Sequence, residues 1–84
     1  MIYVKQERLD EDAILIDVSG VLDEDAVPVL QDVCRRHLDR GRKVAVNLEG
    51  ITHITREGRS FIQDIRNSVE LVHVPEFVKT GDLL

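Results

Sequence analysis

The N-terminal part of the chain alternates between apolar and polar side chains and predicts two strands. Residues 2–8 and residues 13–18 follow the two-residue period of a strand with one buried face. Only a polar turn at residues 10–12 separates them, so the two strands are expected to pair antiparallel. The second strand is expected to end at residues 19–20, where serine and glycine interrupt the pattern.

A helical period follows the second strand. The acidic residues 23–25 supply an N-cap and negative charge for a first turn, in which the missing N–H of Pro28 costs nothing. Gly41, one residue after Arg40, is the expected stop. The pattern therefore predicts a helix in which Cys34 acts as a small buried hydrophobe. Its apolar face contains Ala26, Leu30, Val33, Cys34, His37 and Leu38.

The second half of the chain predicts another strand and another helix. Residues 43–48 form a nearly continuous apolar run, which is typical of a central strand covered by helices. Residues 49–54 are expected to form a loop, and Thr55 is expected to cap a helix that ends near Ser68. The side chains expected to be largely buried are Leu30, Val44, Val46, Leu48, Phe61, Ile62 and Ile65.

A last strand completes the predicted fold. It is expected at residues 71–74, where Pro75 ends it, and residues 76–84 are expected to form a short helical or irregular tail. The order β-β-α-β-α-β contains two strand–helix–strand crossovers, which imply parallel pairing. The sequence therefore predicts an α/β fold with a mixed four-stranded sheet and helices mainly on one face. Residues 1–84 are expected to be a single domain, because a chain of this length buries only one core.

Composition and charge exclude several kinds of function. With a net charge of −5 and only three aromatic residues, the chain offers no stacking platform for nucleic acid. One cysteine permits no internal disulfide, and the three histidines show no metal-ligand spacing, so neither a metal site nor a cofactor is expected. No nucleophile–base pair or phosphate-binding glycine loop indicates an enzyme. Without a signal peptide or an apolar run of about 20 residues, a cytoplasmic protein with no direct membrane insertion is expected.

A basic cluster stands out against this acidic background. Residues 1–34 hold nine acidic and two basic side chains, whereas residues 35–84 hold seven acidic and nine basic ones. The cluster either closes the first helix, where cations complement the negative end of the helix dipole, or binds an anion. It comprises Arg35, Arg36, Arg40, Arg42 and Lys43.

Two segments resemble the signature of a known family. Residues 20–23 (GVLD) and 26–30 (AVPVL) resemble the G-x-L-D…A-P-x-L start of the first helix of STAS domains. Residues 44–58 (VAVNLEGITHITREG) are similar to that family's strand–loop–helix signature, in which an apolar strand ends in D-L-x-x-V-x-x-I-D-S-S-G. STAS domains include the bacterial anti-sigma-factor antagonists and related domains of sulfate transporters. The resemblance covers residues 2–75 and implies a STAS-like fold, shortened at its C-terminus.

The resemblance fails at the family's phosphorylation site. With the second motif anchored on Gly58, the family's aspartate falls at Thr55, its first serine at Arg56 and its phosphorylated serine at Glu57; the strand-end aspartate falls at Asn47. Glu57 is therefore a degenerate phosphorylation position. It is either a stabilising first-turn glutamate or a partial imitation of a phosphoserine. Neither interpretation leaves a serine to be phosphorylated.

The resemblance implies a non-catalytic, regulatory protein-interaction module that is not switched by serine phosphorylation at the usual site. The implied partner is an anti-sigma-factor-like or kinase-like protein. The alternative is an accessory STAS domain of a transporter or a lipid-trafficking complex. A homodimer is also compatible with the sequence. Thr55 and Ser60 remain candidates for a substitute phosphoacceptor. The expected partner-binding residues are Asp23, Thr55, Arg56, Glu57, Gly58 and Arg59.

Overall fold

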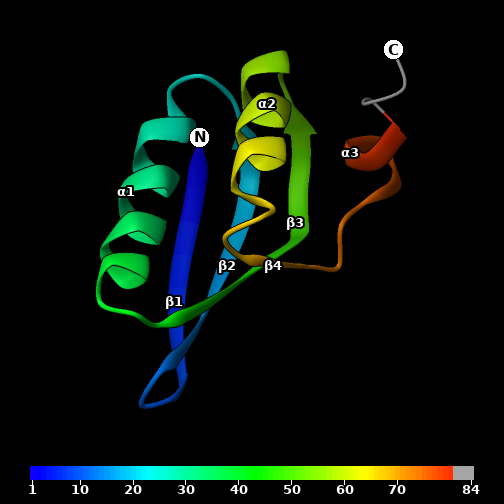
Figure 1. The fold of residues 1–84 in the computed structure, drawn as a ribbon. Helices are drawn as coiled ribbons and strands as arrows, with labels where there is room; N and C mark the ends of the chain where they lie inside the picture. The colour runs from blue at the N-terminus through cyan, green and yellow to red at the C-terminus, as the bar shows by residue number, and fades with distance from the viewer. Residues whose placement is uncertain (81–84) are drawn as a thin grey trace.

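The structure is a computed structural model that describes residues 1–80. Its four strands form one sheet in the order β1-β2-β3-β4 (Figure 1). β1 pairs antiparallel with β2, and the pairs β2–β3 and β3–β4 are parallel, so the predicted mixed sheet and element order are confirmed. Residues 81–84 of the predicted tail lie outside the described residues. Along the chain the elements are β1 (Ile2–Asp10), β2 (Ala13–Leu22), α1 (Ala26–Asp39), β3 (Lys43–Ile54), α2 (Arg56–Ile65), β4 (Glu70–Val72) and α3 (Glu76–Thr80).

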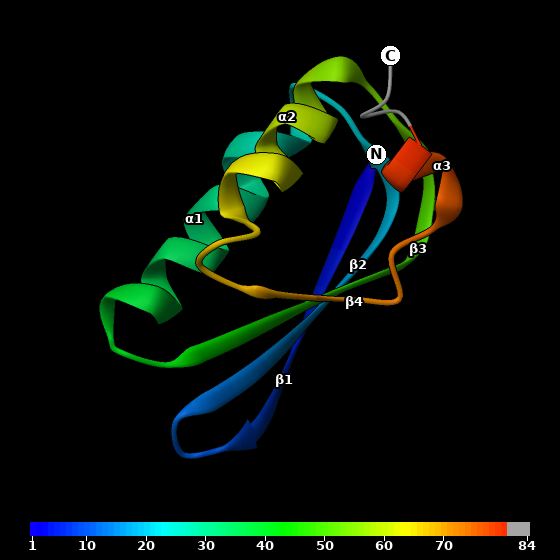
Figure 2. The same ribbon diagram turned by 45° about the vertical axis from the view of Figure 1, so that its right-hand side comes forward.

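The helices cover one side of the sheet. In Figure 2, α1 and α2 lie together on the same side of the strands. The right-handed crossovers that a parallel pair requires bring both helices to this face. The short α3 packs beside α2, with Val78 buried in the core. No helix within residues 1–80 is long and apolar enough to cross a membrane.

Several predicted boundaries are wrong. β1 continues to Asp10, α2 ends at Ile65 rather than near Ser68, and β4 is Glu70–Val72 rather than residues 71–74. The two largest differences concern the central strands. β2 does not end at residues 19–20 but continues to Leu22. Residues 49–54 are not a loop, because β3 continues through them to Ile54. The two extensions pair with each other, with Ser19 opposite Gly50 and Leu22 opposite Ile54.

Two bulges in β3 explain why the two-residue period did not predict residues 49–54 as part of the strand. Between Asn47 and Gly50 the strand advances three residues while β2 advances two, and a second extra residue lies between Ile51 and His53. The buried positions of β3 therefore change from a spacing of two to a spacing of three, at Leu48, Ile51 and Ile54. The side chain of Asn47 holds the first bulge, because its Oδ1 accepts a hydrogen bond of 3.0 Å from the Glu49 N–H.

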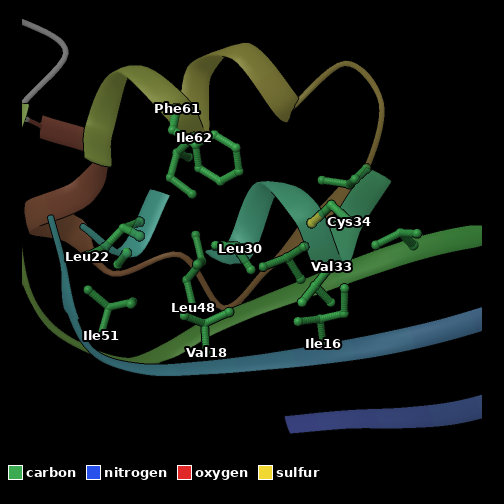
Figure 3. Packing of buried hydrophobic residues seen from close by; sticks show 14 of the residues in the cluster. Ile16, Val18, Leu22, Leu30, Val33, Cys34, Leu48, Ile51, Phe61 and Ile62 are labelled. Atoms are coloured by element: carbon green, nitrogen blue, oxygen red, sulfur yellow. The ribbon is translucent and has the colours of Figure 1, made fainter. Parts of the chain in front are cut away.

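The core lies between the helix-covered face of the sheet and the two long helices. Figure 3 shows Leu30 of α1 and Phe61 and Ile62 of α2 facing the apolar side chains of β2 and β3. Six of the seven predicted core residues are buried, and Ile65 is only half-buried because it is the last residue of α2. Cys34 is buried on the inner face of α1, as predicted.

Candidate functional site

The end of β2 and the start of α2 meet at one backbone carbonyl. The Leu22 C=O accepts a hydrogen bond of 3.0 Å from the Thr55 N–H and one of 3.4 Å from the Thr55 hydroxyl. The Thr55 Oγ1 in turn accepts a hydrogen bond of 3.2 Å from the Gly58 N–H, so Thr55 is the N-cap of α2 as predicted. The hydroxyl is thus engaged both as donor and as acceptor.

Gly58 allows this close approach. A Cβ built at residue 58 would overlap the carbonyl oxygen of Leu22 and lie 3.0 Å from the carbonyl carbon. Only glycine lets the first turn of α2 lie against the backbone of β2 in this way. The glycine on which the second motif was anchored therefore has a packing role: it is buried and offers a partner no side chain.

Asp23 organises the loop beside this junction. Its Oδ1 accepts hydrogen bonds of 3.1 Å from the Asp25 N–H and 3.0 Å from the Ala26 N–H, and so satisfies the first turn of α1. Because Leu22 and Ile54 are register partners, Asp23 and Thr55 follow at the same end of the sheet. The structure therefore brings the two predicted segments together.

Arg56 and Glu57 are the exposed members of the predicted set. Both line a hollow of about 410 Å³ between α1 and α2, together with Val27 and Gln31 of α1 and with Phe61. We call it the α1–α2 hollow. Sequence analysis did not assign Val27 or Gln31 to the site, although they are four residues apart and so lie on one face of the helix.

Arg59 points elsewhere. Its Nη2 donates a hydrogen bond of 3.2 Å to the Phe77 carbonyl of α3, and its Nε is buried without a hydrogen-bond partner. The side chain lines a groove of about 160 Å³ on the other side of α2, with an apolar floor that includes Ile62 and Val78. Arg59 is therefore separated from the α1–α2 hollow, and it contributes to the packing of α3.

A chain of polar contacts that joins α1, the residue before β3 and β1 was also missed by sequence analysis. The Arg42 guanidinium donates a hydrogen bond of 2.9 Å to Nδ1 of His37, and Nε2 of His37 donates one of 2.7 Å to Oε1 of Gln6. The guanidinium can only donate, which fixes this histidine tautomer. Partial burial, followed by the charges of Arg42, Arg36 and neighbouring arginines, lowers the pKa of His37. The basic residues at the end of α1 signalled this effect.

Cys34, the one cysteine of the chain, is buried in the core. Burial raises the pKa of the Cys34 thiol to about 11, which leaves it protonated at neutral pH. Within residues 1–80, no three histidine, cysteine, aspartate or glutamate side chains gather as metal ligands would.

No protein-family model and no curated protein matches the sequence. Solved structures do. The fold is similar to the anti-sigma-factor antagonist SpoIIAA in its unphosphorylated form, with a TM-score of 0.71 at 16% identity over 98% of this chain and 84% of that chain. The phosphorylated form of the Bacillus cell fate determinant SpoIIAA gives 0.70 at 14% identity, over 96% and 82%.

Two further structures extend this likeness. An anti-sigma factor antagonist from Mycobacterium paratuberculosis has a TM-score of 0.66 at 12% identity, over 96% of this chain and 93% of that chain. Mglu has a TM-score of 0.70 at 24% identity, over 86% of this chain but only 19% of Mglu. At these identities the likeness concerns the fold. The chain therefore has the SpoIIAA-like fold that its STAS resemblance implied, with a mixed four-stranded sheet and α1 and α2 on one face.

Proposed function

We propose that the chain is a non-catalytic, regulatory protein-binding module of the bacterial cytoplasm, of the type represented by anti-sigma-factor antagonists. The observation that carries this proposal is the junction at Leu22, which sets the Asp23 loop beside the exposed Arg56 and Glu57 in a SpoIIAA-like fold. A non-catalytic role is supported by the protonated thiol of Cys34 and by the engaged hydroxyl of Thr55, neither of which is a free nucleophile.

The partner is proposed to bind across the α1–α2 hollow. Apolar and polar side chains both line it: Val27, Gln31, Arg56, Glu57, Ser60, Phe61 and Asp64. A transient protein interface is about as polar as the rest of a protein surface, so this mixed lining suits one. Asp23 and Gly58 hold the neighbouring backbone in place rather than contact the partner, because Asp23 bonds to the Ala26 N–H and Gly58 packs against the Leu22 carbonyl.

Arg56 allows the partner surface to be tested without loss of stability. Charge reversal by Arg56→Glu places a negative charge at the first residue of α2, where the helix dipole favours it. We expect the variant to keep its denaturation midpoint and to lose the partner that the wild-type chain captures from native extracts. Arg35→Glu, an exposed reversal on α1, is the matched control and should retain the partner. If Arg56→Glu binds as the wild type does, the α1–α2 hollow is not the contact surface.

The identity of the captured protein distinguishes the two proposed settings. An anti-sigma-factor-like or kinase-like protein supports the antagonist type, whereas a transporter or lipid-trafficking component supports the accessory-domain alternative.

A second prediction concerns phosphorylation at the start of α2, where the family's serine is replaced by Glu57. Glu57 has no hydroxyl, and the Thr55 hydroxyl is held between the Leu22 carbonyl and the Gly58 N–H. We expect Glu57→Ser to be phosphorylated poorly by a kinase that acts on anti-sigma-factor antagonists, because Thr55 and Arg56 still replace the motif around the acceptor. Intact mass after incubation with kinase and ATP measures this, with the wild-type chain as control. A stoichiometric phosphate on wild-type Thr55 or Ser60 would show that the switch has moved.

A further inference from the structure

We propose that the outer edge of β1 is a self-association surface, at which a second copy of this chain adds its own β1 antiparallel and continues the sheet. β1 is an edge strand of 9 residues, whereas β4 at the opposite edge has 3. An unpaired edge is a template for another strand. This surface lies apart from the α1–α2 hollow, so the proposal does not depend on the proposed function.

One hydrogen bond fixes which backbone groups are available on this edge. The Val21 N–H donates to the Met1 carbonyl at 3.1 Å, and the β1–β2 register continues unbroken from Ile2 to Arg8. Antiparallel strands exchange hydrogen bonds at every second residue pair, so the odd-numbered residues of β1 bond to β2. The N–H and C=O groups that point away from the sheet belong to Ile2, Val4, Gln6 and Arg8.

Charge selects one register for two copies related by a two-fold axis. With the axis at Gln6, Lys5 lies opposite Glu7 of the second copy, and this pair occurs twice. With the axis at Lys5, two lysines face each other; with the axis at Glu7, two glutamates do. Opposite charges directly across a strand pair are favourable and like charges are unfavourable. Of these three registers, the Gln6 register is therefore the favourable one, and its hydrogen-bonded pairs use only outward-pointing backbone groups.

The same register brings the exposed apolar side chains of β1 together. Tyr3 is 65% exposed and Leu9 is 54% exposed. Tyr3 alternates with Lys5 and Glu7 on the face away from the helices, and Leu9 lines a hollow with Ala13 and Ala45 of the neighbouring strands. In the Gln6 register, Tyr3 of each copy lies near Leu9 of the other, just beyond the regular edge, so both side chains cover apolar surface that the single chain leaves in water.

The pairing closes on itself as a dimer. The register of β1 shifts between Arg8 and Asp10, which ends the regular edge after Arg8. The contact is isologous, so one copy saturates the edge of the other. On the helix side, the His37 Nε2 holds the Gln6 side chain through a hydrogen bond of 2.7 Å, which keeps it above the strand at the two-fold axis.

Charge variants of the full chain test the register by sedimentation equilibrium. The wild-type chain is expected at twice its 9.6 kDa mass. Lys5→Glu and Glu7→Lys should each weaken self-association by about tenfold to a hundredfold, because both pairs become repulsive. Mixing the two variants should restore dimers, since each then meets its complement, and the double exchange Lys5→Glu with Glu7→Lys should dimerise alone. Glu70→Lys, the same change on β4, is the matched control and should dimerise as the wild type does.

A backbone variant tests the hydrogen bonds. Gln6→Pro removes an N–H that points away from β2, so the chain should stay folded and become monomeric. Gln6→Ala loses the contact with His37 but keeps its N–H, and should remain dimeric. The proposal is overturned if the wild-type chain is monomeric at concentrations on the order of 1 mM. It is also overturned if the mixed charge variants fail to associate, a result that does not depend on the folding of the proline variant.

Discussion

At the residue scale, the Leu22 carbonyl shows how a short motif serves the fold before it serves a partner. Thr55 binds this carbonyl through its N–H and its hydroxyl, and Gly58 lies against it with no side chain between. Glu57, between them in sequence, is exposed. Gly58, which matches the family pattern, is thus a structural residue. Thr55 differs from the pattern but caps the helix, whereas Arg56 and Glu57, which also differ from it, face solvent.

Gly58→Ala should destabilise the chain strongly. The new Cβ would overlap the Leu22 carbonyl oxygen, and the backbone of β2 cannot give way as a flexible side chain would. We expect a loss of about 1–3 kcal/mol in the free energy of unfolding, measured by urea denaturation. Ser60→Ala, exposed on the same helix, is the control and should change it by less than about 0.5 kcal/mol. Equal midpoints for the two variants would contradict the contact.

His37 should make stability depend on pH. Its pKa is lowered in the folded chain by partial burial and by the surrounding arginines, so the unfolded chain binds a proton first as the pH falls. Stability should therefore decrease as the pH falls below about 6.5, the ordinary value for histidine, and level off below the folded-state pKa. Urea midpoints at pH 7.5 and 6 measure the decrease. In His37→Gln it should be smaller; an identical decrease would assign it to other groups.

At the element scale, β3 explains most of what the sequence analysis missed. Its first half obeys the two-residue period and was predicted from Val44, Val46 and Leu48. Its second half obeys no strand period, because two extra residues shift the buried positions to every third residue. Such bulges depend on the partner strand, so a pattern read along one segment cannot reveal them. The same extension of β2 and β3 carries the chain to the junction at Leu22.

The candidate site was predicted in part for the same reason. Sequence analysis assigned the Asp23 loop and the start of α2 to one set of partner-binding residues, and the structure brings them together at one end of the sheet. The contact between α2 and α3 could not be predicted, because α3 is short and its position depends on packing. Arg59 was therefore included among the partner-binding residues, although its guanidinium donates to the Phe77 carbonyl.

Arg59→Met should release α3 while leaving the rest of the fold in place. The methionine keeps the apolar stem but removes the hydrogen bond to the Phe77 carbonyl. It also removes a buried Nε without a partner, so the two effects oppose each other in global stability. We expect faster amide hydrogen exchange at Val78 and Lys79, whose N–H groups bond to the Pro75 carbonyl. Unchanged exchange there, or equally faster exchange in β2 and β3, would contradict this role.

At the scale of the whole molecule, a single core between one sheet face and two helices holds the chain together. The periodic patterns predicted most of this core, because a helix or strand that buries one face carries apolar residues at regular intervals. Ile65 was placed in the core by the same helical spacing, but it ends α2 and is only half-buried. Where an element stops is decided by tertiary contacts that the pattern does not contain.

Truncation of Leu30 should therefore cost more than truncation of Ile65. Leu30 is fully buried at the centre of the core (Figure 3), and Leu30→Ala should lower the free energy of unfolding by about 2–5 kcal/mol. Ile65→Ala should lower it by about 1–2 kcal/mol, because part of the side chain already contacts water. Denaturant midpoints of both variants give the comparison. A larger loss for Ile65→Ala would place the centre of the core at the end of α2.

Cys34 gives this small fold a built-in reporter of its own opening. It is the chain's one cysteine, its side chain is 2% exposed, and its pKa is raised to about 11. A thiol reagent in neutral buffer can therefore react only after α1 has moved away from the sheet. The rate of modification at this one residue then measures how often the core opens, and no dye has to be attached. Every variant carries the same reporter, so all of them can be ranked by one kinetic measurement under native conditions.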